Sequence, residues 1–247
     1  MRWTQGLLDE LARAGHEHLD AAYVGGYDRK AGFDTDAADE VRLLRGLGLG
    51  EHSTLVDLGA GTGTLALAAA AICRRVVAVD LSPEMVAATK EKVAALGVSN
   101  VECVQAGFLS YEHQGTPADF VYSRNALHHL TDFWKAVALQ SIALMLRPGG
   151  ILRLRDIVFA FDPPEAERFI RDWLNSGRER PDEGWTRAEF EEHLRDEHST
   201  FNWLLEPMLE RAGFDVKEAD YGSRRIYAHY VCVKTEGNAP SAARSGN

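Results

Sequence analysis

An apolar strand that runs directly into three alternating glycines is the feature that most constrains this chain. Val56-Asp57-Leu58 leads into Gly59, Gly61 and Gly63, and a second apolar run ends on Asp80. Glycines at such a junction let the backbone turn tightly and present bare N–H groups to a ligand. An acid at the tip of the next strand can accept two hydrogen bonds from a ribose diol. The pattern therefore predicts a pocket for an adenosine-containing cofactor.

The spacing of the glycines narrows the choice of cofactor. A dinucleotide-binding loop has the form G-x-G-x-x-G/A, with the third small residue where the helix packs against the strand. Here Thr64 stands at that place, and the third glycine comes one residue early. A nicotinamide-dependent oxidoreductase is therefore disfavoured.

Four motifs in order give the chain a resemblance to a known family. The loop D-x-G-x-G-x-G from Asp57 resembles motif I of the class I S-adenosylmethionine-dependent methyltransferases, with a domain like methyltransferase types 11 and 25. The segments Val79–Met85, Asp119–Leu130 and Leu146–Leu152 resemble the family's second strand, its fourth strand with the loop that follows, and its turn into strand five.

The resemblance implies both a fold and a reaction. The fold is α/β, a Rossmann-like doubly wound sheet of about seven strands, mostly parallel with an antiparallel last strand, plus a helical lid. The reaction is transfer of a methyl group from S-adenosyl-L-methionine to O, N or C of a small-molecule acceptor by in-line displacement, with S-adenosyl-L-homocysteine as product. The alternative is a non-catalytic S-adenosylmethionine-binding sensor or assembly protein.

The same resemblance implies the cofactor contacts. Asp57 and the glycine loop are expected at the methionine end, Asp80 at the ribose, and Leu81 and Met85 beside the adenine. The family often has an acid after strand three, where this chain has Gly107, so adenine is expected to contact backbone near Gly107 and the ring of Phe108. The predicted cofactor residues are Tyr27, Asp57, Gly59, Ala60, Gly61, Gly63, Asp80, Leu81, Met85, Gly107, Phe108 and Asn125.

Catalytic and acceptor residues are less constrained by the sequence. His128 and His129 follow the fourth strand, and either imidazole could take a proton from the acceptor, or both could simply cap or pack against the next helix. Thr200 could be a helix N-cap or an acceptor contact. The predicted acceptor-binding residues are Tyr23, Glu197, His198 and Thr200.

The chain reads as a single methyltransferase domain over residues 1–235. It comprises an N-terminal cap (1–48), a cofactor-binding core (54–158), a lid insertion (159–203) and a C-terminal helix with strands (204–235). Residues 236–247 are rich in Gly, Ser, Ala and Pro and are expected to be disordered.

Composition limits the partners. The net charge of −10 makes nucleic acid an unlikely partner, since phosphate binding needs a basic face. The three cysteines have no C-x-x-C spacing, so we expect reduced thiols and no metal. With no signal peptide or membrane-length apolar run, the protein is expected to be cytoplasmic. The oligomeric state is not readable from the sequence.

Overall fold

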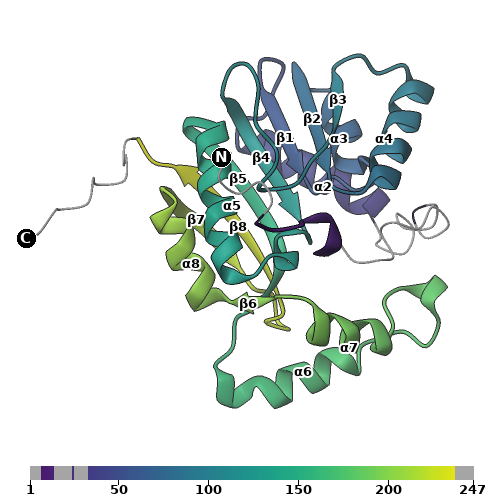
Figure 1. Ribbon diagram of the computed structural model, residues 1–247, viewed down its shortest axis with the longest axis vertical. Helices are drawn as coiled ribbons and strands as arrows, with labels where there is room; N and C mark the ends of the chain where they lie inside the picture. The colour runs from purple at the N-terminus through teal and green to yellow at the C-terminus, as the bar shows by residue number, and fades with distance from the viewer. Residues whose placement is uncertain (1–6, 14–23, 25–32, 237–247) are drawn as a thin grey trace, which may run out of the picture.

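The computed structural model describes residues 7–13, 24 and 33–236, and its centre is one twisted sheet (Figure 1). The strand order is β3-β2-β1-β4-β5-β8-β7, and a short eighth strand, β6, pairs with β5. The first five strands pair in parallel, whereas β8 runs antiparallel to both β5 and β7. The strands are β1 Thr54–Leu58, β2 Arg75–Asp80, β3 Val101–Gln105, β4 Ala118–Arg124, β5 Leu146–Phe159, β6 Thr200–Phe201, β7 Phe214–Asp220 and β8 Tyr227–Lys234. The predicted doubly wound sheet is confirmed.

Helices cover both faces of the sheet, as the apolar strands require. All five residues of β1 are buried, which is typical of a parallel strand covered on both sides. One face packs on α5 and α8, and the other packs on α2 and α3. The α-helices are α2 Phe33–Gly46, α3 Thr64–Ala70, α4 Pro83–Leu96, α5 Asp132–Met145, α6 Ala166–Leu174, α7 Arg187–Asp196 and α8 Asn202–Arg211, and the 3-10 turns are η2 Leu11–Arg13, η4 Leu127–His129, η5 Pro163–Glu165 and η6 Pro181–Glu183. None of these described helices is long and apolar enough to cross a membrane.

Helix α4 shows how local sequence sets an element's ends. Ser82 caps it by accepting a hydrogen bond from Met85 N at 3.1 Å, and Pro83 occupies its first position. Gly97 ends it in the left-handed conformation. The cap holds Met85 at the carboxyl end of β2, where its side chain lines a cavity.

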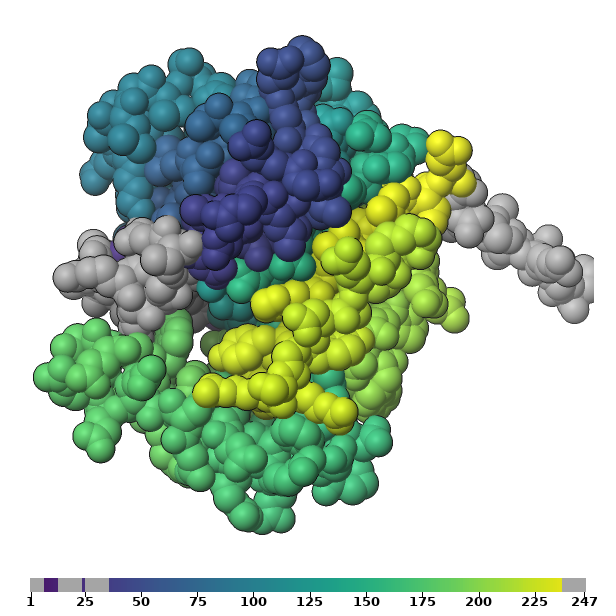
Figure 2. Space-filling view, turned by 180° about the vertical axis from the view of Figure 1, so that it is seen from behind, coloured from purple at the N-terminus to yellow at the C-terminus, as the bar shows by residue number. Residues whose placement is uncertain are grey.

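The segment between β5 and α8, which is predicted to be a lid and is called the lid below, carries helices of its own. Its helices α6 and α7 lie beyond the carboxyl ends of the strands, and the lid forms one edge of the molecule when it is seen from behind (Figures 1 and 2). Its apolar cluster combines Trp173 and Phe190, whose rings stack with centroids 4.6 Å apart, with Ile157 and Phe159 of β5. The chain leaves the core at Phe159 and returns at Phe201, and these two residues pair in register between β5 and β6.

Some sequence-based predictions fall outside the described residues. Tyr23, Tyr27 and residues 237–247 are among them. Of a helix expected over residues 7–21, the described part holds only the 3-10 turn Leu11–Arg13. The division of the chain into cap, core, lid and C-terminal parts stays a prediction.

Candidate active site

A cavity lies at the carboxyl ends of β1, β2, β3 and β4, where the strand order reverses direction between β1 and β4. In open α/β sheets this switch point is where ligands bind. The cavity wall includes most of the predicted cofactor residues. These are Asp57, Gly59, Ala60, Gly61, Asp80, Leu81, Met85, Gly107, Phe108 and Asn125.

Two of the glycines have different tasks. Gly59 has a φ of +74°, and a Cβ on it would lie 2.5 Å from the Cβ of Ala126 in the loop after β4. Only glycine therefore lets the two loops meet at the cavity. Gly63 does not line the cavity; a Cβ there would lie 2.4 Å from Thr89 Cγ2, so this glycine lets α3 pack against α4.

Asp80 joins the glycine loop to the start of α4. Its Oδ2 accepts a hydrogen bond from Gly61 N at 2.8 Å, and its Oδ1 accepts one from Ser82 N at 2.9 Å. Asp80 also lines the cavity. Asp80 therefore both shapes the loop and presents an acid to the cavity.

Asp57 is a second acid beneath the same loop. It is buried, and burial followed by the charge of Asp80 raises its pKa to about 8, although the N–H of Ala66 lowers it. Two acids in one apolar site keep one of them protonated near neutral pH.

Glu10 is a cavity residue that the sequence did not reveal. It comes from the N-terminal segment, is buried, and accepts a hydrogen bond from Leu109 N at 3.1 Å through Oε1. A Cβ on Gly107 would lie only 2.4 Å from that oxygen. Burial raises the pKa of Glu10, against hydrogen bonds from the 108–110 turn. The carboxylate missing at position 107 is thus supplied from 97 residues earlier in the chain.

Asn125 lies where the first cavity meets a second one. Its φ of +48° is uncommon for a residue with a side chain, and its N–H donates to Arg155 O at 2.8 Å. Arg124 and Asn125 line both cavities. The second cavity is otherwise lined by Arg155, Asp156, Asp220, Tyr221, Gly222, Ser223, Arg224, Tyr227 and His229.

The two neighbouring histidines face different surroundings. His129 lines the first cavity, whereas His128 lines neither cavity and is buried. The Nδ1 of His128 bonds to Asp156 of β5, and its backbone N–H donates to the same carboxylate at 3.0 Å. Burial alone would lower the pKa of His128, but Asp156 and Glu197 outweigh it and raise the pKa to about 10.

The predicted acceptor residues of the lid lie at its junction with the core. Glu197, His198 and Thr200 line neither cavity. Glu197 contacts His128, the N–H of His198 donates to His128 O at 2.9 Å, and Thr200 Oγ1 donates to Asp132 Oδ2 at 3.3 Å. Thr200 is also not a helix cap, because α8 begins after Phe201 and has no side-chain cap. In this structure these three residues connect the lid to the core.

Comparisons with known proteins agree with the geometry. Residues 55–150 match a family model described as a methyltransferase domain. An uncharacterized methyltransferase of Bacillus cereus is 33% identical over 155 residues, which are 63% of this chain and 68% of that protein.

Solved structures share the fold. The YcgJ protein of Bacillus subtilis has a TM-score of 0.59 at 19% identity, covering 80% of this chain and 98% of its own. Magnesium protoporphyrin IX methyltransferase of Synechocystis, solved with bound S-adenosylmethionine, has a TM-score of 0.62 at 15% identity, covering 94% and 100%. With the glycine loop, Asp80 and the switch-point cavity in place, the chain belongs to the class I S-adenosylmethionine-dependent methyltransferases.

Proposed function

We propose that the protein transfers the methyl group of S-adenosylmethionine to an O, N or C atom of a small-molecule acceptor bound in the second cavity. The observation that carries this proposal is the sharing of Arg124 and Asn125 by the two cavities. A methyl group passes in line between two reactants held about 3–3.5 Å apart, so donor and acceptor sites must adjoin.

The first cavity fits the cofactor of the family. The close approach at Gly59 makes a cradle of bare backbone for the methionine end, and Asp80 would hold the ribose diol. Leu81, Met85 and Phe108 would contact the adenine, with Glu10 beside it. When bound, S-adenosylmethionine supplies an electrophilic methyl group on a sulfonium leaving group.

The second cavity has the chemistry of a polar acceptor site. Arg155 and Arg224 bring positive charge, Asp156 and Asp220 bring negative charge, and Tyr227 adds an aromatic wall. Arg155 also pairs with Asp36 at 2.9 Å and with Glu40 at 3.0 Å, which docks α2 beside the cavity. Mixed charge in a cavity favours a small acceptor with hydrogen-bonding groups over a nucleic acid.

His129 is the side chain that we assign to the acceptor's proton. Its imidazole would accept the proton that the acceptor atom loses when it is methylated. His129 lines the first cavity, which shares Arg124 and Asn125 with the acceptor cavity, whereas His128 is enclosed by Asp156 and the lid. His128 acts in this scheme by positioning its neighbour.

Labelled S-adenosylmethionine tests the proposal. The purified protein is incubated with the small-molecule and macromolecular fractions of a cell extract separately, and labelled products are identified by mass spectrometry. We expect label in the small-molecule fraction, and at least several-fold less of it with Asp80→Ala when the cofactor is below saturation. Label confined to protein or nucleic acid would overturn the acceptor assignment. Cofactor binding without transfer to either fraction would support the non-catalytic alternative, which the family result does not favour.

A further inference from the structure

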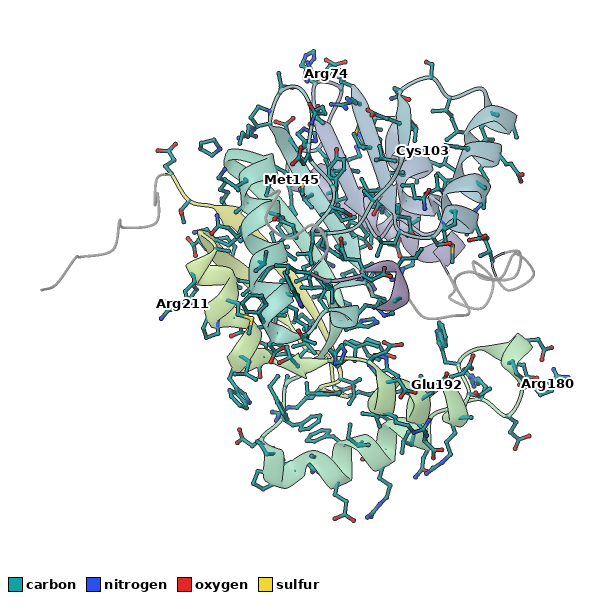
Figure 3. The ribbon with its side chains drawn as sticks, in the orientation of Figure 1. Arg74, Cys103, Met145, Arg180, Glu192 and Arg211 are labelled. Atoms are coloured by element: carbon teal, nitrogen blue, oxygen red, sulfur yellow. The ribbon has the colours of Figure 1, made fainter. Side chains whose placement is uncertain are left out.

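Two imidazoles and one carboxylate converge between the lid and the core, outside both cavities. His128 comes from η4 of the core, and His193 and Glu197 come from α7 and the residue that follows it. One ligand-type atom from each residue lies within 4.8 Å of the other two. Figure 3 shows α7, on which Glu192 is labelled, beyond the sheet with side chains between it and the core.

The contacts at the centre of this cluster are short but are not directed as hydrogen bonds. Glu197 Oε2 lies 2.9 Å from His128 Nε2 and 2.6 Å from His193 Nδ1. The same buried oxygen nevertheless has no hydrogen-bond partner of acceptable geometry. Ligand atoms that all point at one common ion give this arrangement, because each atom is aimed at the ion and not at its neighbour. Hydrogen-bonded pairs would be aimed at each other.

The outer nitrogens of both imidazoles are fixed by other groups. His128 Nδ1 bonds to Asp156, and His193 Nε2 lies 2.7 Å from Ser199 Oγ. Histidine ligands commonly donate their second ring N–H to a carboxylate or another oxygen, which orients the ring and leaves the other nitrogen for the metal. Both rings are buried.

We propose that His128, His193 and Glu197 bind a divalent transition-metal ion, with Zn²⁺ chemistry, that ties the lid to the core. Two neutral imidazole nitrogens and one carboxylate are a known zinc donor set with the fourth position left to solvent. Glu197 retains 22% side-chain exposure, so the cluster lies at the edge of the solvent-excluded interior. A cation here also adds positive charge beside the carboxylates of Asp156 and Glu197, both of which contact His128.

The test uses the full-length protein and the metal alone. After treatment with a chelator and dialysis, Zn²⁺ is titrated by calorimetry, and Co²⁺ is added as a probe whose visible absorption reports a low-coordinate site. We expect one equivalent to bind and the midpoint of thermal unfolding to rise. Lid cleavage in limited proteolysis should slow at least several-fold with Zn²⁺.

Variants separate this site from adventitious binding. His193→Ala and Glu197→Gln should weaken Zn²⁺ binding by at least tenfold, in line with losses when a metal site is disturbed. His52→Ala and Glu191→Gln are matched controls, because both side chains are exposed and lie outside the cluster. No saturable binding to the wild-type protein, or equal affinity in all four variants, would overturn the proposal, even if a variant fails to fold.

Discussion

The carboxylate of Glu10 occupies the space that a side chain at position 107 would need. A Cβ on Gly107 would meet Glu10 Oε1 at 2.4 Å and Cδ at 2.8 Å, and the nearest other atom is the flexible end of Leu81. The two positions are therefore coupled through one small volume in the wall of the cofactor cavity.

That coupling predicts non-additive variants. Gly107→Ala should weaken S-adenosylhomocysteine binding in the wild-type background, because the new methyl group displaces Glu10. In a Glu10→Ala background, Gly107→Ala should reduce the binding free energy of S-adenosylhomocysteine by less. The difference between the two reductions, which is the coupling free energy of the two positions, should be about 1 kcal/mol. Calorimetric titration of the four proteins measures this; strict additivity would show that the two residues do not share the space when the cofactor is bound.

Replacing Asp80 should weaken cofactor binding without unfolding the protein. Asp80→Ala removes the hydrogen bonds from Gly61 N in the loop and from Ser82 N at the start of α4, and it removes the acid that would hold the ribose, so we expect a loss of affinity of about tenfold or more. Asp119→Ala is the matched control. It also loses two hydrogen bonds, to Thr54 N and Arg147 Nε, but at the opposite end of the sheet. Equal losses in both variants would argue against the ribose role.

Replacing His129 should lower turnover, whereas replacing His128 should mainly lower stability. His129→Ala should lower kcat by about 10²-fold or more with little change in cofactor affinity, since it removes the proton acceptor. His128→Ala leaves Asp156 buried without its partner and should cost about 3–5 kcal/mol of stability. Urea unfolding and single-turnover rates distinguish these outcomes, with His113→Ala as a control at a histidine that lines neither cavity. An unchanged rate in His129→Ala would refute its assignment.

The raised pKa of Asp57 makes stability depend on pH. The folded-state pKa of about 8 lies above the ordinary value of 3.8, so the folded protein binds more protons than the unfolded chain between these limits. The contribution of Asp57 to the free energy of unfolding is therefore greatest below about pH 4. It falls as the pH rises to about 8, by at most about 1.4 kcal/mol per pH unit.

Denaturant titration across that range checks the slope due to Asp57. Asp57→Asn should flatten it, because the amide does not titrate. Glu51→Gln, at an exposed acid, should leave the slope as it is. The contribution of Asp57 is the free energy of unfolding of the wild-type protein minus that of Asp57→Asn at each pH. If this difference rises from about pH 4 to about pH 8, the pKa of Asp57 is not raised in the folded protein.

The lid is held by a small apolar cluster that it shares with β5. Trp173 is 1% exposed and stacks on Phe190, so Trp173→Ala should destabilise the lid by about 3–5 kcal/mol. Trp203 is 49% exposed, and Trp203→Ala should cost much less. Hydrogen exchange of lid amides reports the local effect; equal protection in both variants would mean that the cluster does not hold the lid.

The sheet and the donor pocket were predictable because their signals are local. The apolar run before the glycines predicts a strand at 54–58, and the apolar run after the helix-ending Gly97 predicts one at 101–105; both strands have these bounds. The turn at residues 147–150 predicts a strand over 151–158, but the strand begins at Leu146, because Leu146 already pairs with Ala118 across a register irregularity. Such a pairing has no signal in the strand's own residues.

The rest of the site depends on contacts between distant segments. Glu10 meets Leu109 across 99 positions, and no periodicity or motif links them. His193 and Glu197 read as an ordinary i, i+4 pair on a polar helix until His128, 65 residues earlier, lies against them. The sequence indicated which residue types were present in the lid, but not which of them face the core.

The register of Phe159 with Phe201 has an evolutionary consequence. Because the chain leaves and re-enters the core at neighbouring points, insertions or deletions between Phe159 and Thr200 need not change the register of the strands. None of the residues that line the first cavity, which would hold the methyl donor, belongs to that segment. Selection can thus remodel one side of the enzyme while the machinery that holds the methyl donor stays unchanged.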